Sequence, residues 1–226
     1  HALDLLGVQQ VFTAGVLVKR LESQVPGLNA LKGRFVFLEQ VQANLSLADK
    51  LSAKLQSWCG WALLEQARAS ATAVVLFTSG SENLPKAVPL THLNLLTNLR
   101  DVFQVLHIRA TDRMINMLPP FHSFGLMATM LLPVCGGIPV VFYPKPTEGG
   151  MLARLIEAYR VTVLAATPTF LNGIVRAADD VHLTSLRVVA TGAEKCPLPL
   201  YETVSRRWPG VKILEGYGIT ECSPVV

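Results

Sequence analysis

Charged side chains are scarce in this sequence of 226 residues. Asp, Glu, Lys and Arg make up 16% of it, whereas hydrophobic residues make up 50%. A disordered chain has the opposite balance, so the composition indicates a globular protein that is rich in core residues. The formal net charge of +4 suits an anionic small molecule or a membrane surface. Because no basic run of the kind that binds nucleic acid is present, we expect no nucleic acid partner.

Closely spaced cysteines are missing as well. The four cysteines form no C-x-x-C pair, which favours buried free thiols in a reducing compartment over a metal site or a disulfide framework. No secretory signal is visible either. We therefore expect a cytoplasmic protein, associated at most with the inner surface of the membrane. The cysteines are Cys59, Cys135, Cys196 and Cys222.

A long unbroken hydrophobic run is also absent. Residues 114–144 contain no charged side chain, but prolines and the adjacent Gly136 and Gly137 interrupt them. A membrane-spanning helix needs about 20 consecutive apolar residues. We interpret this stretch as a buried strand, a buried helix and a second buried strand.

From residue 73 onward, strand-like and helix-like patterns alternate. Such alternation predicts an α/β fold, with parallel sheets flanked by helices on both faces. Residues 1–72 give weaker signals, which suggest helices over 2–22 and 47–66 and a strand over 34–41. The predicted strands after residue 72 are 73–77, 114–118, 138–142, 161–165, 186–191 and 211–215. The predicted helices are 91–106, with Thr91 as N-cap, and 124–134, 151–159, 169–178 and 198–208.

The stretch FTSGSENLPKAV, residues 77–88, has the composition of a phosphate-binding loop. Its hydroxyl groups and the backbone N–H groups near Gly80 can donate to phosphate oxygens, and Lys86 adds a charge-assisted contact. The spacing after Gly80 does not fit a Walker loop, which disfavours a P-loop phosphotransferase. A polar loop with a solvated lysine remains the alternative for this stretch alone.

A second stretch, LEGYGITECSPV at residues 214–225, follows a predicted strand. Ligands bind at the carboxyl edge of open parallel sheets, where this stretch would lie. Tyr217 stands between two glycines and can lay its ring against a flat heterocycle. Thr220 offers a hydroxyl group, and Glu221 offers a hard oxygen ligand for Mg²⁺.

Together these stretches resemble motifs of the adenylate-forming, acyl-activating superfamily of acyl-CoA synthetases, luciferases and peptide-synthetase adenylation domains. LPPFHSFG at 118–125 is similar to its acyl-pocket motif, and TGAEKCP at 191–197 stands where the family has its adenine-pocket loop. The residue sequences of the loops most resemble those of acyl-[acyl-carrier-protein] synthetase domains, which are often fused to a lysophospholipid acyltransferase. Glu82 and Asn83 depart from the Thr-Gly that is usual in the family, and Ala87 departs from a common glycine.

The resemblance implies an ATP- and Mg²⁺-dependent ligase. It would convert a fatty acid to acyl-AMP and pass the acyl group to acyl carrier protein or CoA, in a setting such as phospholipid acyl recycling. Residues 73–226 would form the nucleotide- and acyl-binding part of the large N-terminal domain, after a weakly defined portion over 1–72. The implied catalytic residues are Lys86, His122, Thr220 and Glu221, with Glu221 also the metal ligand. The implied nucleotide-binding residues are Thr78, Ser79, Gly80, Ser81, Lys86, Gly192, Ala193, Glu194, Glu215, Gly216, Tyr217, Gly218 and Thr220.

His122 is the candidate on the acid side of the site. A lone histidine in an apolar stretch is often a core residue, but the resemblance places this one at the carboxylate end of an acyl pocket. Relatives that activate amino acids carry an aspartate there for the substrate ammonium, and PPFHSFG has none. A tunnel for a long acyl chain would lie beyond it, unless the neighbouring side chains only pack in the core. Those neighbours are Phe121, Phe124, Leu126 and Met127.

The resemblance also implies that the ribose-binding aspartate, the hinge and the lysine of a small C-terminal domain would fall after Val226. On that basis, residues 1–226 alone should bind ATP weakly and not adenylate an acid. The alternative function is a nucleotide- or acyl-binding module without turnover.

Overall fold

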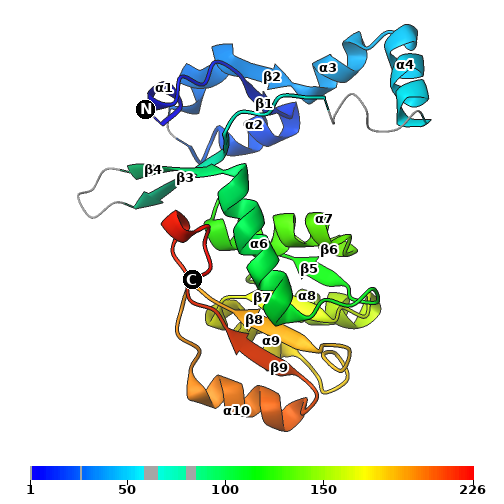
Figure 1. Ribbon diagram of the computed structural model, residues 1–226, viewed down its shortest axis with the longest axis vertical. Coiled ribbons are helices and arrows are strands. Elements are labelled where there is room, and N and C mark those ends of the chain that lie inside the picture. Colours follow the sequence, from blue (N-terminus) through cyan, green and yellow to red (C-terminus); the bar gives the residue numbers. More distant parts are fainter. Residues whose placement is uncertain (1, 26, 59–65, 80–84) are drawn as a thin grey trace. The chain divides into compact units, whose positions relative to one another are not determined.

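The computed structural model describes residues 2–25, 27–58, 66–79 and 85–226 (Figure 1). The chain folds as two compact units, residues 1–69 and residues 70–226. None of the described helices is both long enough and apolar enough to cross a bilayer.

The first unit is built from short elements around a small parallel sheet. Its two strands pair in parallel, with Val11 opposite Phe35. The single helix predicted over 2–22 is therefore wrong: Gly7 has a φ of 63°, and a strand follows it. The strand predicted over 34–41 ends at Phe37. The elements are α1 (Ala2–Leu5), β1 (Val11–Thr13), α2 (Gly15–Leu21), the 3₁₀ helix η1 (Leu28–Arg34), β2 (Phe35–Phe37), α3 (Leu38–Asn44) and α4 (Leu47–Trp58).

The second unit contains a five-stranded sheet in which every described pair of neighbours is parallel. The strand order is β6-β5-β7-β8-β9. This arrangement confirms the α/β fold expected from the alternating sequence pattern. The strands are β5 (Met114–Asn116), β6 (Val140–Phe142), β7 (Val163–Ala166), β8 (Val188–Thr191) and β9 (Lys212–Glu215).

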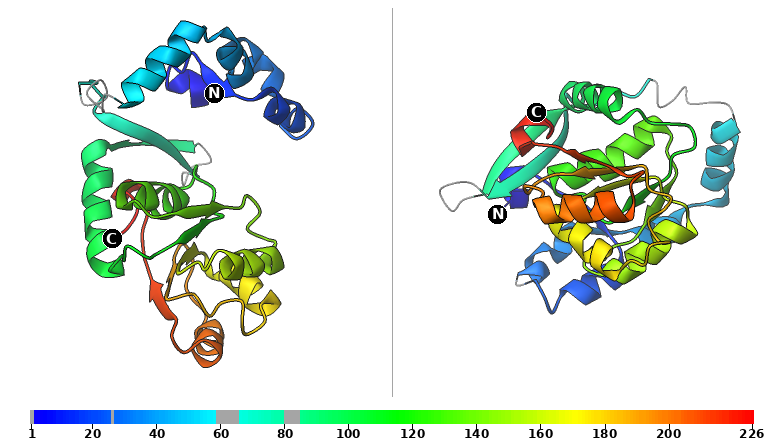
Figure 2. Two further views of the ribbon diagram at one scale, coloured as in Figure 1. Left: turned by 90° about the vertical axis from the view of Figure 1, so that its right-hand side faces the viewer. Right: turned by 90° about the horizontal axis from the view of Figure 1, so that it is seen from below.

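Helices cover both faces of this sheet, as Figure 2 shows for green α6 on one side and α8 and α9 on the other. Alternate residues of each strand enter two separate cores, because successive side chains of a strand point to opposite faces. The first core packs Ile115, Leu164, Val189 and Ile213 against α8 (Gly149–Ala158), α9 (Pro168–Ala177) and α10 (Leu198–Arg207). The second packs Met114, Val163 and Val188 against α6 (His92–Leu106), the π-helix η2 (Gly125–Leu131) and α7 (Leu132–Gly136).

An antiparallel hairpin precedes the parallel sheet. It consists of β3 (Thr72–Ser79) and β4 (Pro85–Thr91), with Thr78 opposite Lys86. The sequence analysis predicted β3 but missed β4, because Pro85 and Pro89 are typical strand breakers. Its inward residues Leu76, Val88 and Leu90 join the second core. Packing against the second core therefore anchors both strands of the hairpin.

Two helices on the second core show how local sequence sets their ends. Thr91 caps α6 as predicted, and it forms a capping box with Asn94. The helix predicted over 124–134 begins as the π-helix η2. The Leu132 N–H donates to the carbonyl of Met127, five residues before it, which is the π-helix pattern. The next residue, Pro133, has no N–H and cannot donate to the carbonyl four residues before it, as an α-helix would require.

The strand order places a topological switch at the centre of the sheet. The chain leaves β5 towards β6 through η2 and α7 on one face, and it leaves β7 towards β8 through α9 on the other. The segments after β5 and β7 therefore diverge at the carboxyl edge. Open parallel sheets bind their ligands in such a crevice.

A buried ion pair joins the amino ends of three strands, at the opposite edge. Asp112 is 2% exposed and accepts hydrogen bonds from Arg187 Nη2 at 2.5 Å, the Thr162 hydroxyl at 2.7 Å and the Arg109 N–H at 2.7 Å. Burial alone raises the pKa of Asp112. The Arg187 guanidinium and the other two donors outweigh burial and hold the pKa below its usual value.

We predict that Asp112→Ala lowers the free energy of unfolding by about 3 kcal/mol at neutral pH, because Arg187 would be left with a largely buried, unpaired charge. The folded pKa is depressed, so the stabilisation is complete above the unfolded pKa of about 3.9 and is lost as pH falls through the folded pKa. Urea unfolding at neutral and acidic pH would measure the difference in free energy of unfolding between Asp112→Ala and the unsubstituted protein, and this difference should become smaller in acid.

Asp101→Ala is the matched control. Asp101 is paired with Arg100 at 3.0 Å, but its side chain is 56% exposed, so the loss should stay below about 0.5 kcal/mol. Equal losses for the two variants would contradict the anchoring role of Asp112.

Candidate functional site

Most of the predicted site residues follow strands that end at the same edge of the sheet. Residues 117–124 follow β5, residues 192–197 follow β8, and residues 216–226 follow β9. The parallel register places Thr191 opposite Glu215 at the ends of β8 and β9. Segments that are far apart in the sequence therefore meet at the carboxyl edge.

Lys86 and Glu221 form the most direct contact between the predicted motifs. Lys86 Nζ lies 3.3 Å from Glu221 Oε1, although 135 residues separate them in sequence. Lys86 belongs to β4, and Glu221 belongs to the short 3₁₀ helix η3 (Thr220–Cys222). Their side chains are 63% and 39% exposed, so both charges remain accessible to a ligand.

The Glu221 carboxyl group is held in its ionised form. Its own backbone N–H makes the largest contribution to a lowered pKa, and the hydrogen bond and charge of Lys86 add to it. A carboxylate that stays charged at neutral pH is a suitable oxygen ligand for Mg²⁺.

Thr220 lies beside the acyl-pocket motif. Its hydroxyl group donates to Ser123 Oγ at 3.2 Å, and both residues are half-buried. The sequence analysis did not single out Ser123, although this residue lies within LPPFHSFG. The contact joins the segment after β5 to the segment after β9.

The segment 216–226 is a closed turn tied to α6. Gly218 and Val225 form an antiparallel bridge, and the Val226 N–H donates to the Tyr217 carbonyl at 3.0 Å. The Asn98 side chain donates to the Val225 carbonyl at 2.7 Å and accepts from the Val225 N–H at 3.3 Å. The Asn98 amide thus pairs with the backbone of Val225 as a neighbouring strand would. No motif in the sequence indicates this role.

The loop after β8 is fixed by two glutamates. Glu194 accepts from the hydroxyl and N–H groups of Thr169 at 2.6 and 3.3 Å, at the start of α9. Glu215 accepts from the Cys196 N–H at 2.9 Å. Ala193 has a φ of 67°, which turns the backbone sharply between them. Both carboxylates have partners within the protein. Ala193 and Glu194 are exposed, whereas Gly192 is buried.

Two aromatic residues stand at the exposed rim of the same edge. Tyr217 is 73% exposed. Phe121 is 66% exposed, and the centroid of its ring lies 4.6 Å from that of the His122 ring. Of the other side chains that were expected to line a tunnel, Met127 belongs to the second core and Leu126 packs against that core.

Part of the predicted phosphate loop lies outside the described residues. Gly80 and Ser81 fall there, as do Glu82 and Asn83. Thr78 is half-buried on β3, opposite Lys86.

The residues present fit a magnesium ion that is shared with a nucleotide. Within the described part of the chain, no group of three His, Cys, Asp or Glu side chains could hold a metal ion by itself. Mg²⁺ in nucleotide enzymes is usually bound through one or two carboxylates together with substrate phosphates. Glu221, beside Thr220 and Lys86, matches that arrangement.

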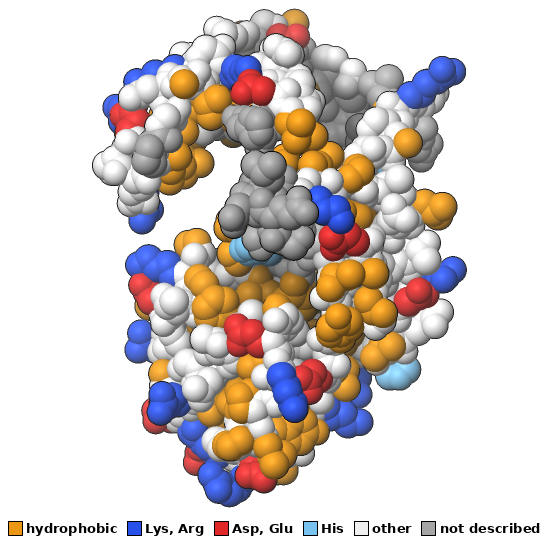
Figure 3. All heavy atoms as spheres, turned by 90° about the vertical axis from the view of Figure 1, so that its left-hand side faces the viewer, with side chains coloured by type: hydrophobic (Ala, Val, Ile, Leu, Met, Phe, Trp, Pro, Cys, Tyr) orange, Lys and Arg blue, Asp and Glu red, His pale blue; other side chains and the backbone are white. Residues whose placement is uncertain are grey.

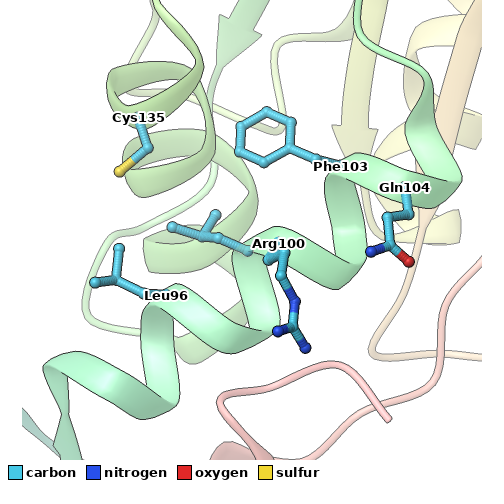
Figure 4. A pocket seen from close by; sticks show the side chains of 6 residues that line it. Leu96, Arg100, Phe103, Gln104 and Cys135 are labelled. Atoms are coloured by element: carbon cyan, nitrogen blue, oxygen red, sulfur yellow. The ribbon is translucent and has the colours of Figure 1, made fainter.

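An open apolar hollow of about 490 Å³ lies between α6 and α7 (Figure 4). None of the predicted site residues lines it. Its lining residues are Leu96, Leu99, Arg100, Phe103, Gln104 and Cys135.

Charges of both signs are spread over the surface. Figure 3 shows Lys and Arg side chains interspersed with Asp and Glu among the coloured residues of one face, with groups of hydrophobic side chains between them. Because the charges are mixed over this face, the candidate site is distinguished by local contacts such as the ion pair of Lys86 with Glu221.

The chain is similar to known ligases. Residues 1–226 match a family described as AMP-binding enzyme. The 4-coumarate–CoA ligase 1 of Arabidopsis thaliana is 32% identical over 156 residues, which cover 66% of this chain and 28% of that protein. The chain thus spans less than a third of the length of this curated relative.

Solved structures show the same fold. The O-succinylbenzoate CoA synthetase of Bacillus subtilis, in complex with ATP and magnesium ion, matches 100% of this chain and 42% of that one, with a TM-score of 0.75 and 23% identity. A protein assigned as a long-chain-fatty-acid CoA ligase from Rhodopseudomonas palustris matches 70% of this chain and 39% of that one, with a TM-score of 0.62 and 26% identity.

We predict that Gly218→Ala disrupts the closed turn. A Cβ at this position would lie 2.0 Å from the Pro224 carbonyl oxygen, so the backbone must move. The melting temperature should fall by about 3 to 8 °C, the size expected for an overpacked site in a domain of this length.

Gly216→Ala is the matched control within the same motif. Its Cβ would meet the Thr191 carbonyl oxygen at 3.6 Å, an ordinary contact, so the melting temperature should change by less than about 2 °C. Thermal unfolding compares the two variants, and equal melting temperatures would show that the turn is not tightly closed.

Proposed function

We propose, from the premise that this chain belongs to the AMP-binding enzyme family, that it carries the nucleotide- and acid-binding site of an ATP-dependent acid–thiol ligase. The observation that carries the proposal is the meeting of Lys86 and Glu221 at 3.3 Å. The two motifs that were predicted to bind phosphate and metal would thereby serve one site at the carboxyl edge of the parallel sheet.

The reaction would begin with a carboxylic acid and ATP. A carboxylate is a poor acyl donor, because its leaving group would be oxide. An oxygen of the carboxylate attacks the α-phosphorus of ATP, the bond to pyrophosphate breaks, and acyl-AMP forms. A thiolate then attacks the acyl carbon and AMP leaves, which yields the thioester.

Each proposed residue acts on a defined part of this reaction. Lys86, with Thr78, Ser79 and Ser81, would hold the β- and γ-phosphates and stabilise the charge that builds on the leaving group. The Thr220 hydroxyl would donate to the α-phosphate. Bound Mg²⁺ would supply charge neutralisation of the phosphates. Glu221 would hold that ion through its charged carboxylate.

The nucleotide base would lie beside the Tyr217 ring. That ring is exposed, and Gly216 and Gly218 leave the approach to it unobstructed. The backbone of Gly192, Ala193 and Glu194 would border the base on its other side. Glu215 would support this loop through its bond to Cys196.

We further propose a fatty acid as the substrate and acyl carrier protein or CoA as the acceptor, in phospholipid acyl recycling. The support is the absence of an acidic residue in Phe121–Gly125 and the apolar character of this segment. His122 would face the carboxylate of the acid. An aromatic acid, such as the substrate in the name of the 4-coumarate ligases, is the competing outcome.

Acid-dependent ATP–pyrophosphate exchange tests the proposed function. The native protein that contains residues 1–226 should exchange pyrophosphate with long-chain fatty acids and more slowly with cinnamic acids. Exchange with cinnamic acids only would overturn the fatty acid proposal. Nucleotide binding without exchange for any acid would instead indicate a binding module.

His122→Asp serves as the site-specific control in this screen. A second carboxylate would repel the acid but not ATP, so the KM for the acid should rise about tenfold or more while the KM for ATP stays unchanged. Equal shifts in both constants would show that His122 has a structural role.

We predict that Glu221→Gln lowers turnover more than Lys86→Ala does. Glutamine keeps the shape and loses the charge, so a loss of about a hundredfold is expected for a preorganised electrostatic group. Lys86 is more exposed, and water can replace part of its contact, so a loss of about tenfold is expected.

A Mg²⁺ series separates the two effects. Higher Mg²⁺ should partly rescue Glu221→Gln and leave Lys86→Ala unchanged. A Glu221→Gln protein with normal turnover and normal Mg²⁺ dependence would remove the metal role of Glu221.

A further inference from the structure

The acid-side turn, residues 121–125, touches both nucleotide-side loops. Ser123 Oγ accepts the hydroxyl hydrogen bond of Thr220 at 3.2 Å, across 97 residues of sequence. The ring of Phe124 lies under the loop after β8, since a Cβ on Gly192 would be 3.4 Å from the Phe124 Cζ atom. One short turn therefore supports the two loops that were assigned to the nucleotide.

This turn is itself rigidly built. The His122 N–H donates to the Pro119 carbonyl at 3.2 Å, and the Leu126 N–H donates to the His122 carbonyl at 2.8 Å. Gly125 packs so closely that a Cβ there would lie 2.1 Å from the Pro119 carbonyl oxygen. Ser123 is thus presented from a fixed backbone, which is what a positioning residue requires.

The two hydroxyl groups can exchange roles. Each hydroxyl group has one donor and two acceptor positions. When Thr220 donates to a phosphate oxygen, the Ser123 hydroxyl can turn and donate to Thr220 Oγ1 instead. The pair then keeps the Thr220 side chain in one rotamer and directs its only proton towards the phosphate.

We propose that Ser123 is a positioning residue for the adenylation step, acting through Thr220. The proposal rests on the proposed function. Because Ser123 directly follows His122, the same turn would set the acid and the α-phosphate in register. Such alignment of two reactants is a large source of catalysis in a two-substrate reaction.

A double-mutant cycle tests the proposal in the native protein that contains residues 1–226. Ser123→Ala should lower kcat/KM for ATP in acid-dependent pyrophosphate exchange by about tenfold, the size of one lost hydrogen bond. On a Thr220→Val background, where no hydroxyl remains to be oriented, Ser123→Ala should cost less than about twofold. A residue that serves packing alone would give the same loss on both backgrounds, and that result would overturn the proposal.

Ser185→Ala is the matched control. Its half-buried hydroxyl group donates to the Val161 carbonyl at 2.8 Å, away from the predicted site residues. This variant should keep kcat/KM for ATP within about twofold of the parent, because it loses a bond of the same kind elsewhere. If the parent protein shows no exchange with any acid, both proposals fall. If it is active and the cycle is additive, only the role of Ser123 falls.

Discussion

Parallel pairing of strands that are buried on both faces is the constraint on which residues 70–226 depend. A parallel pair cannot be joined by a tight turn, so each strand must be followed by a crossover, and here the crossovers are helices that cover the two faces. The same rule brings the carboxyl ends of the strands to one edge. Asp112 and Arg187 join strands at the amino edge, which is opposite to the edge of the candidate site.

The sequence predicted the repeating part of this architecture well. Apolar runs of strand length between amphipathic segments are a strong signal, and Thr91 was identified as a helix cap from its residue type alone. β4 was missed because prolines usually end strands, and only its pairing with β3 shows that Pro85 and Pro89 are tolerated. The helix predicted over 2–22 is wrong because β1 is specified by its partner β2, which is distant in sequence.

The site shows the same division between local and long-range information. Lys86, Thr220 and Glu221 could be singled out because their chemistry is visible in short motifs. Ser123 and Asn98 could not be singled out, since the role of a serine or an asparagine depends on the residue to which it is hydrogen-bonded. Ser123 meets Thr220, and Asn98 meets the backbone of Val225. Contacts of this kind require the folded chain.

The ion pair of Lys86 with Glu221 is weak because both side chains are exposed. A weak pair places two opposite charges side by side, and breaking it costs little free energy. In the proposed function, a triphosphate would offer Lys86 a stronger partner, and Glu221 would then be free for a cation. This exchange of partners would therefore cost little free energy.

The prolines of β4 also affect how the hairpin meets other molecules. Proline has no N–H, so it fits in β4 only where its nitrogen faces away from β3. Pro85 and Pro89 are four residues apart and share that orientation, which removes two donors from the free side of the strand. An unpaired strand edge is normally a template on which further chains add and aggregate. Here two donors are missing, at Pro85 and Pro89, so this edge is a poorer template for an added strand than an edge without proline.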